Sequence, residues 1–318
     1  MSGRRKPRKK RSNKRLAYGI IAAFSILVCF FIYFSLHSSA PKIAIVDHLS
    51  FFPEQCNPTF VNECANILEE EGLTWAYHNG TEVTVNFYRN LPSCGTNLII
   101  LRVHSAIMKT EKGTISILGL FTSERYLGAE DAAKKYPKDI ANQRLVEAFF
   151  SQEEREQGIS YFAIVPEFVE KSMNGKFKDT IIIMMGCEGL GYDGVTYTEM
   201  AEAFIKKGAK VYISWNKPIS INHTDQATVH LLQSLILHKR TIEKAVEQTN
   251  YDVGPDPIYN STLKYHPSTA EVGNYTILNL ESSLTMNVAY TSLIPKTLKR
   301  CKYTAHKSAI FLFVNEVP

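Results

Sequence analysis

The sequence predicts an α/β domain with a mostly parallel central sheet, preceded by one transmembrane helix. The apolar run 180–187 carries no charge and is short, which is typical of a strand buried on both faces, and 97–103 is a second short, mostly apolar run. Segments with apolar residues at helical spacing alternate with such runs, as they do in α/β domains. Residues 16–36 form an uninterrupted apolar stretch of 21 residues, which is long enough to cross a bilayer.

The N-terminal arm favours a signal anchor. Residues 1–15 contain nine Lys or Arg and no acidic residue. Such an arm could bind nucleic acid, but its position directly before the apolar stretch favours the positive-inside rule and a cytoplasmic N-terminus. The small residues 38–40 resemble a signal-peptide cleavage site, yet Pro41 follows them and the apolar run is longer than a signal peptide requires. We therefore expect an uncleaved anchor with the main domain outside the cytoplasm.

The composition of the remaining chain indicates a globular domain and excludes an obvious polyanion-binding surface. Of 36 Lys and Arg, 27 remain after the nine of the tail are removed, against 31 Asp and Glu, which gives a formal charge of −4. No nucleic-acid partner is expected. Four sequons suit an extracytoplasmic glycoprotein, and four cysteines could form two disulfides in three pairings, leaving Cys187 unpaired. The sequons begin at Asn79, Asn222, Asn260 and Asn274, and the four cysteines are Cys56, Cys64, Cys94 and Cys301.

The first half of the domain predicts three strands, a helix and a hairpin. A strand covers 43–46 and ends at Asp47, and a helix opened by 57–59 closes at Gly72. Further strands are expected at 73–77 and 97–103, and the second of these is followed directly by His104 and Ser105. A hairpin is expected to join 106–108 to 115–121.

The second half of the domain predicts helices around two further strands. A polar helix is expected over 129–150 and a strand over 180–187. A Gly-rich turn then leads to a helix over 195–207, which Gly208 ends, and to a strand over 209–214. Two more helices are expected at 225–237 and 241–249.

Two of these strands carry a histidine and a cysteine to their carboxyl ends. Parallel strands place those ends at one edge of the sheet, so we expect His104 and Cys187 to lie near each other. A cysteine attacks as its thiolate, and a nearby imidazole lowers the thiol pKa and later protonates the leaving group. The alternative is that Cys187 is a small buried apolar residue and His104 a hydrogen-bonded loop residue.

The residues around these two positions resemble a known family. The run NLIILRVHS at 97–105 and the run TIIIMMGCEGLG at 180–191 are similar to the caspase-like cysteine peptidases of clan CD. The CHAT branch is the most similar over 179–248, and separases resemble the chain through Met-Gly-Cys. The resemblance implies a three-layer caspase-like fold over 41–274, with 275–318 a C-terminal segment of unknown role.

The resemblance also implies roles for individual residues. Cys187 would be the nucleophile and His104 the general acid/base, with the backbone N–H groups of Ser105 and Cys187 as the oxyanion hole; most relatives have Gly where Ser105 stands. Asp47 occupies the family's S1-pocket position and, with Trp215, forms the expected substrate-binding set. A basic P1 residue is therefore expected, although Met185 stands where some Arg- or Lys-specific relatives have Asp. The alternative is that Asp47 is a turn residue.

No cofactor or metal is expected. The run 189–194 fits G-x-G-x-x-G, but the next strand ends without the acidic residue that a dinucleotide site requires. Metal-ligand spacings and a G-x-S-x-G serine elbow are absent from the sequence. The sequence therefore predicts a membrane-anchored, extracytoplasmic cysteine endopeptidase. The alternative is a catalytically silent caspase-like ectodomain that binds a peptide or serves as a scaffold.

Overall fold

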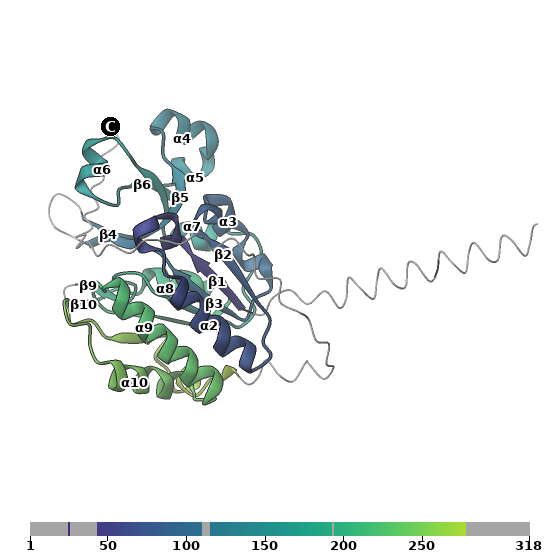
Figure 1. Ribbon diagram of the computed structural model, residues 1–318. Coiled ribbons are helices and arrows are strands. Elements are labelled where there is room, and N and C mark those ends of the chain that lie inside the picture. The colour runs from purple at the N-terminus through teal and green to yellow at the C-terminus, as the bar shows by residue number, and fades with distance from the viewer. Residues whose placement is uncertain (1–24, 26–42, 110–114, 193, 278–318) are drawn as a thin grey trace, which may run out of the picture. The chain divides into compact units, whose positions relative to one another are not determined.

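The central element is a six-stranded, mostly parallel sheet. The computed structural model describes residues 25, 43–109, 115–192 and 194–277, and every element below belongs to the unit that comprises 41–318 (Figure 1). The strand order is β12-β11-β8-β3-β1-β2, and only β12 runs antiparallel to its neighbour. These strands are β1 Ile43–Asp47, β2 Trp75–Asn79, β3 Leu98–Arg102, β8 Thr180–Met184, β11 Ala209–Trp215 and β12 Leu263–His266. The predicted α/β class with a mostly parallel sheet is confirmed.

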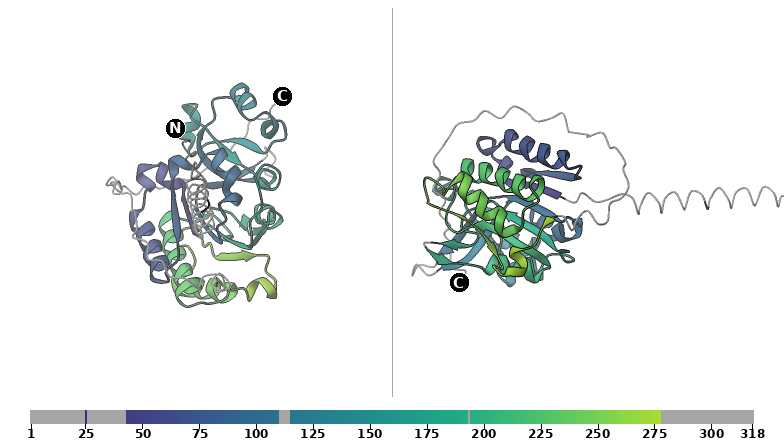
Figure 2. Two further views of the ribbon diagram at one scale, coloured as in Figure 1. Left: turned by 90° about the vertical axis from the view of Figure 1, so that its right-hand side faces the viewer. Right: turned by 90° about the horizontal axis from the view of Figure 1, so that it is seen from below.

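Helices cover both faces of this sheet. Alternate residues of β3 point to opposite faces, so Leu98 and Ile100 pack with α2, α9 and α10, whereas Ile99 and Leu101 pack with α3, α7 and α8. Helices α2, α9 and α10 lie side by side on their face (Figure 2). The helices are α2 Pro58–Glu70, α3 Val85–Asn90, α7 Pro166–Lys171, α8 Glu199–Lys206, α9 Ile221–Leu232 and α10 Ile242–Val253. Burial on both faces explains why these strands read as continuous apolar runs.

The helix predicted after β1 has the expected start and stop signals. Asn57 caps α2 by accepting a 3.2 Å hydrogen bond from the Phe60 N–H, and Pro58 occupies the first turn, where no backbone donor is needed. Gly72 follows the helix with φ +64°, a conformation that glycine adopts without strain. The apolar face of α2 is buried as expected, including Cys64.

A second, antiparallel sheet occupies most of 105–164. Its order is β4-β5-β7-β6, with β4 Ser105–Lys109, β5 Ile115–Arg125, β6 Leu145–Ala148 and β7 Tyr161–Ile164. The predicted hairpin is therefore confirmed as β4–β5. The predicted helix over 129–150 is wrong in its second half. Helix α4 Ala129–Lys135 ends before Pro137, which opens the short α5 Pro137–Ala141, and the chain then enters β6 because β7 offers it a pairing edge.

Other boundaries shift by a few residues. The predicted helix over 195–207 begins only at Glu199, since Val195–Thr196 (β10) pairs with Gly191–Tyr192 (β9). Gly208 ends it with φ +106°, and a Cβ there would lie 2.3 Å from the Phe177 carbonyl oxygen, so only glycine fits. The remaining elements are 3₁₀ turns at His48–Phe51, Pro53–Gln55, Gly80–Glu82 and Leu91–Cys94, helices α6 Gln152–Glu156 and α11 Ala270–Gly273, and a π-helical turn at Gln233–Leu237.

The membrane and disulfide predictions fall largely outside the described residues. None of the described helices is long and apolar enough to cross a bilayer. The predicted span 16–36 lies outside the described part of the chain except for residue 25, as do the basic tail 1–15 and residues 278–318, including Cys301. No disulfide joins any two of the four described cysteines.

Candidate functional site

The carboxyl ends of β3 and β8 bring His104 and Cys187 to one edge of the sheet. The two strands are parallel neighbours, and each of their four paired positions differs by 83 residues, from Leu98 opposite Ile181 to Leu101 opposite Met184. His104 follows the end of β3 by two residues, and Cys187 follows the end of β8 by three. The expectation that these two strands end side by side is confirmed.

Gly186 allows the two strand ends to approach closely. A Cβ at this position would lie 2.3 Å from the Ser105 Oγ and 2.6 Å from the Val103 carbonyl oxygen, so any other residue would push the segments apart. The Ser105 hydroxyl donates a 2.7 Å hydrogen bond to the Cys187 carbonyl. Ser105 thus ties the histidine segment to the cysteine segment, a contact that glycine at this position could not make.

Glu188 fixes the turn that follows the cysteine. Its backbone has φ +63°, a left-handed conformation that is uncommon for a residue other than glycine. Its carboxylate accepts a 3.0 Å hydrogen bond from the Ile107 N–H, and its own N–H donates to the Lys217 carbonyl at 3.1 Å. These bonds connect β4, the turn and the segment after β11.

The Cys187 thiol faces the segment after β11. Its Sγ accepts a hydrogen bond from the Ile219 N–H at 3.5 Å and lies 3.7 Å from the Ile219 carbonyl oxygen, to which it donates. The pKa of the thiol is raised to about 12, mainly by burial. The negative charges of Glu188 and Asp256 also raise this pKa, whereas the hydrogen bond with the Ile219 backbone lowers it. Among the described residues, no hydrogen bond joins this thiol to the His104 ring. Cys187 therefore rests as a neutral thiol.

The His104 ring lies in an aromatic pocket. Its centroid is 5.2 Å from that of Phe150, 5.8 Å from that of Phe52 and 6.2 Å from that of His48. Its Nε2 is 2.6 Å from the Gln55 Oε1. Burial lowers the pKa of His104 well below its usual value, and charge on His48 and Arg102 lowers it further. The imidazole is consequently neutral at pH 7.

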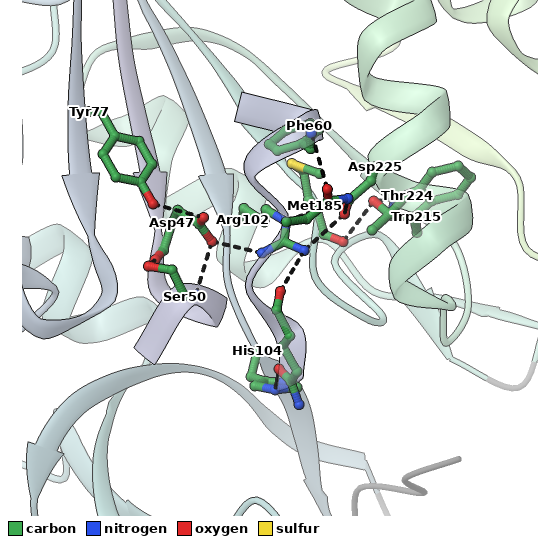
Figure 3. Close-up of polar contacts among 12 residues, drawn as sticks. Asp47, Ser50, Phe60, Tyr77, Arg102, His104, Met185, Trp215, Thr224 and Asp225 are labelled. Atoms are coloured by element: carbon green, nitrogen blue, oxygen red, sulfur yellow. Dashed lines mark hydrogen bonds and ion pairs between the residues drawn. The ribbon is translucent and has the colours of Figure 1, made fainter. Parts of the chain in front are cut away.

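A buried ionic network lies behind the histidine. Arg102, at the end of β3, is fully buried and donates to both oxygens of Asp225 from Nε (2.7 Å) and Nη2 (2.8 Å). Its Nη1 donates to Asp47 at 2.8 Å, and its Nη2 also donates to the Gln55 carbonyl at 3.0 Å. Figure 3 shows this chain of contacts running from Asp47 through Arg102 to Asp225 and toward His104. The guanidinium thus connects β1, α9 and the turn that holds the histidine.

Asp47 is engaged inside the protein. It is 1% exposed, and besides Arg102 it accepts hydrogen bonds from the Tyr77 hydroxyl at 3.1 Å and the Ser50 N–H at 3.2 Å. Its expected role was to bind a basic side chain of a substrate, but Arg102 already supplies that cation. The bond from Ser50 also makes Asp47 the cap of the following 3₁₀ turn, as the turn-residue alternative holds.

Trp215 contributes to the core. It is 2% exposed, and its indole N–H donates to the Thr224 hydroxyl at 2.9 Å, which in turn donates to the Met185 carbonyl at 3.0 Å. The structure therefore places Trp215 between β8 and α9, without an exposed face for a substrate. Met185, which stands where some relatives have Asp, is likewise buried.

Two glycines after Cys187, Gly189 and Gly191, allow the chain to pack closely against the end of β11 and the residue that follows it. A Cβ on Gly189 would lie 2.1 Å from the Ser214 Oγ, and one on Gly191 would lie 2.7 Å from the Asn216 carbonyl oxygen. The Leu190 N–H donates to the Trp215 carbonyl at 2.8 Å. These contacts explain why Gly189 and Gly191 are glycines, whereas Gly194 has φ +81° and open space around it.

A groove of about 430 Å³ between α2 and α9 lies at the other end of the ionic network. Its walls include Asn57 and Asp225, whose side chains are joined by a 2.8 Å hydrogen bond, and Phe60, over which the Arg102 guanidinium stacks at 5.5 Å. Neither His104 nor Cys187 lines it. The groove is therefore separate from the pair of strand ends.

Comparisons with known proteins assign no family. No protein-family model matches the chain, and no curated protein matches it. The roles of the site residues therefore rest on their own geometry and chemistry.

The sequence reasoning missed Gln55, Arg102 and Asp225. One signal for Arg102 was present, because a charged residue inside the apolar run 97–103 requires buried partners. Asp225 and Gln55 lie 123 and 47 residues from Arg102 in the chain. Nothing local marks either of them.

The resting thiol gives a test of its environment. The rate of Cys187 alkylation by iodoacetamide is expected to rise about tenfold per pH unit from pH 7 to 9 without a plateau, because only the thiolate reacts and its pKa is about 12. Peptide-resolved mass spectrometry measures this rate, with the partly buried Cys94 as an internal comparison. A rate that is already constant between pH 7 and 8 would show a thiolate–imidazolium pair and contradict this resting geometry.

Proposed function

We propose that this protein is a cysteine endopeptidase in which Cys187 is the nucleophile and His104 the general acid/base. The observation that supports the proposal is the parallel β3–β8 pairing, since His104 comes two residues after the end of β3 and Cys187 three residues after the end of β8. The Ser105–Cys187 hydrogen bond and the close approach at Gly186 support it, since both hold the two strand ends together. A nucleophile and a base from neighbouring strand ends are the minimum that acyl transfer by cysteine requires.

The proposed reaction uses these groups in two steps. His104 removes the proton from the Cys187 thiol, and the sulfur attacks the carbonyl carbon of the substrate; the C–N bond then breaks as the imidazolium gives its proton to the leaving amine. Water, deprotonated by His104, cleaves the thioester, releases the acid and restores the thiol. The N–H groups of Cys187 and Ser105 are the proposed donors to the oxyanion.

The side chains must reorient for this reaction. The thiol leaves Ile219 and turns toward the imidazole, and the resulting ion pair replaces the neutral pair of the resting state. Hydrogen bonds in a site without substrate are commonly long or misaligned and tighten when substrate binds. We therefore infer that the resting site is a latent form of the proposed peptidase.

A second candidate is a catalytically silent domain that binds a peptide or serves as a scaffold. The observation in its favour is the thiol itself, which is hydrogen-bonded to Ile219 and has a raised pKa. Such a domain would use the same sheet edge without covalent chemistry. The labelling experiment below separates the two candidates.

The proposal does not include a basic P1 preference through Asp47. To bind a substrate Arg or Lys, Asp47 would have to release Arg102, which would leave the guanidinium buried with one carboxylate fewer. Membrane anchoring through 16–36, an extracytoplasmic location, glycosylation and a caspase-like, CHAT-like ancestry complete the proposal. They rest on the sequence patterns described above.

A peptidyl electrophile tests the proposed function. A peptidyl acyloxymethyl ketone is expected to add its mass to Cys187 and to leave Cys94 unmodified, because the peptide directs the electrophile to the catalytic thiol. His104→Gln is expected to abolish the labelling, whereas the matched change His230→Gln on α9 should preserve it. Equal labelling of Cys94 and Cys187, or labelling independent of His104, would favour the silent binding domain.

A further inference from the structure

The side chain of Gln55 lies between the buried ionic network and the proposed general base. It belongs to the 3₁₀ turn Pro53–Gln55 after β1, and its amide is the hydrogen-bond partner of the His104 ring at 2.6 Å. We propose that Gln55 is a positioning residue that holds His104 in the tautomer with the proton on Nε2, so that Nδ1 is the base. This inference rests on the proposed function.

The proposed tautomer follows from the orientation of the Gln55 amide. With its Oε1 toward the ring, 2.6 Å from His104 Nε2, Gln55 is the acceptor and Nε2 the donor in the proposed arrangement. A neutral imidazole has one N–H, which leaves Nδ1 with the lone pair. The low pKa of His104 keeps the ring in this neutral form at pH 7.

Gln55 is itself held at both backbone polar groups. Its N–H donates to the Phe52 carbonyl at 2.9 Å, and its carbonyl accepts from the Arg102 Nη2 at 3.0 Å. Arg102 in turn is fixed by Asp47 and Asp225. The ionic network thus holds the Pro53–Gln55 turn in place through the Gln55 carbonyl. The turn positions the Gln55 side-chain amide, and the amide orients the His104 ring.

This arrangement gives the ionic network a part in the reaction besides stability. A histidine in the wrong tautomer presents a donor where the reaction needs an acceptor. Phe52, Phe121 and Phe150 pack around the ring but offer no hydrogen-bonding groups from their side chains. Among the described residues, Gln55 provides the polar contact that distinguishes the two ring nitrogens.

The tautomer is measured directly in the full-length protein by ¹⁵N-histidine NMR at pH 7.5. The His104 signals are assigned by their loss in His104→Gln. The parent is expected to show Nε2–H with an unprotonated Nδ1, and Gln55→Met, which keeps the length of the side chain but removes the acceptor, is expected to show both tautomers. Gln157→Met is the matched control, since Gln157 is exposed and its side-chain amide donates a 3.2 Å hydrogen bond to the Glu153 carboxylate. A parent with Nδ1–H, or a Gln55→Met spectrum identical to that of the parent, would overturn the proposal.

The kinetic readout separates positioning from structural support. In Gln55→Met the kcat for peptide hydrolysis is expected to fall roughly tenfold or more with an unchanged KM, because general acid–base catalysis contributes about 10²–10⁴-fold. Gln55→Glu keeps an acceptor at Nε2, so it is expected to restore most of the rate and to move the acidic limb of the pH profile upward. Failure of this variant to restore the parental tautomer would also count against the proposal. If the parent hydrolyses no peptide, the proposed function fails, while the NMR result still decides the role of Gln55.

Discussion

Replacing Arg102 with methionine is expected to remove most of the stability of the domain. Arg102 is fully buried between Asp47 and Asp225, which are 1% and 4% exposed. Removing the shared cation leaves two buried carboxylates without their counter-charge, and breaking even one buried pair typically costs about 3–5 kcal/mol. Since domains are stable by about 5–15 kcal/mol in total, little folded Arg102→Met protein is expected at neutral pH.

Urea unfolding followed by circular dichroism measures this loss. Arg144→Met is the matched control. Arg144 pairs with the half-exposed Glu167 at 3.3 Å, and such surface pairs contribute about 0–1 kcal/mol. The other partner of Arg144, Asp139, lies 3.9 Å away and keeps its closer pair with Arg89 at 2.6 Å. Adding Asp47→Asn and Asp225→Asn to Arg102→Met is expected to recover part of the stability, since the uncompensated charges are then removed. An Arg102→Met protein as stable as the Arg144→Met control would contradict the structural role of the network.

The second large effect concerns the nucleophile. Cys187→Ala is expected to reduce peptide hydrolysis by about 10³-fold or more, because the covalent route needs the sulfur. The fold should survive, since the thiol makes only weak hydrogen bonds to Ile219 and alanine is of similar size. Turnover of a peptide library, with a thermal melt of each variant, measures both quantities.

Two further variants, Cys94→Ala and His104→Gln, serve as comparisons for the Cys187→Ala result. Cys94→Ala removes another partly buried thiol, which lies 3.8 Å from the Asn90 carbonyl oxygen, and should retain full activity. His104→Gln should lose activity to a similar extent as Cys187→Ala, because the two residues act as one unit. Hydrolysis by Cys187→Ala at the parental rate would contradict the peptidase proposal. The catalytically silent binding domain would then be the remaining candidate.

Local patterns predicted the elements that end at the site and the β4–β5 hairpin, but not the other two strands of the second sheet. Apolar runs predicted β1, β3, β8 and β11. Strands buried on both faces are recognisable in this way because apolar residues do not alternate with polar ones along them. The segment 145–148 was expected to be helical. Its strand conformation depends on β7, a neighbour that only the folded chain supplies.

The same division applies to the site. A histidine and a cysteine that follow two apolar runs, and the glycine before the cysteine, are visible in the amino-acid order, because strand ends are local features. The groups that surround them are visible in the folded chain alone: the thiol is bonded to Ile219, the imidazole to Gln55, and Asp47 is paired with Arg102. Hydrogen bonds and buried ion pairs join residues that are close in space and remote in the chain, so their partners depend on how the strands and helices pack.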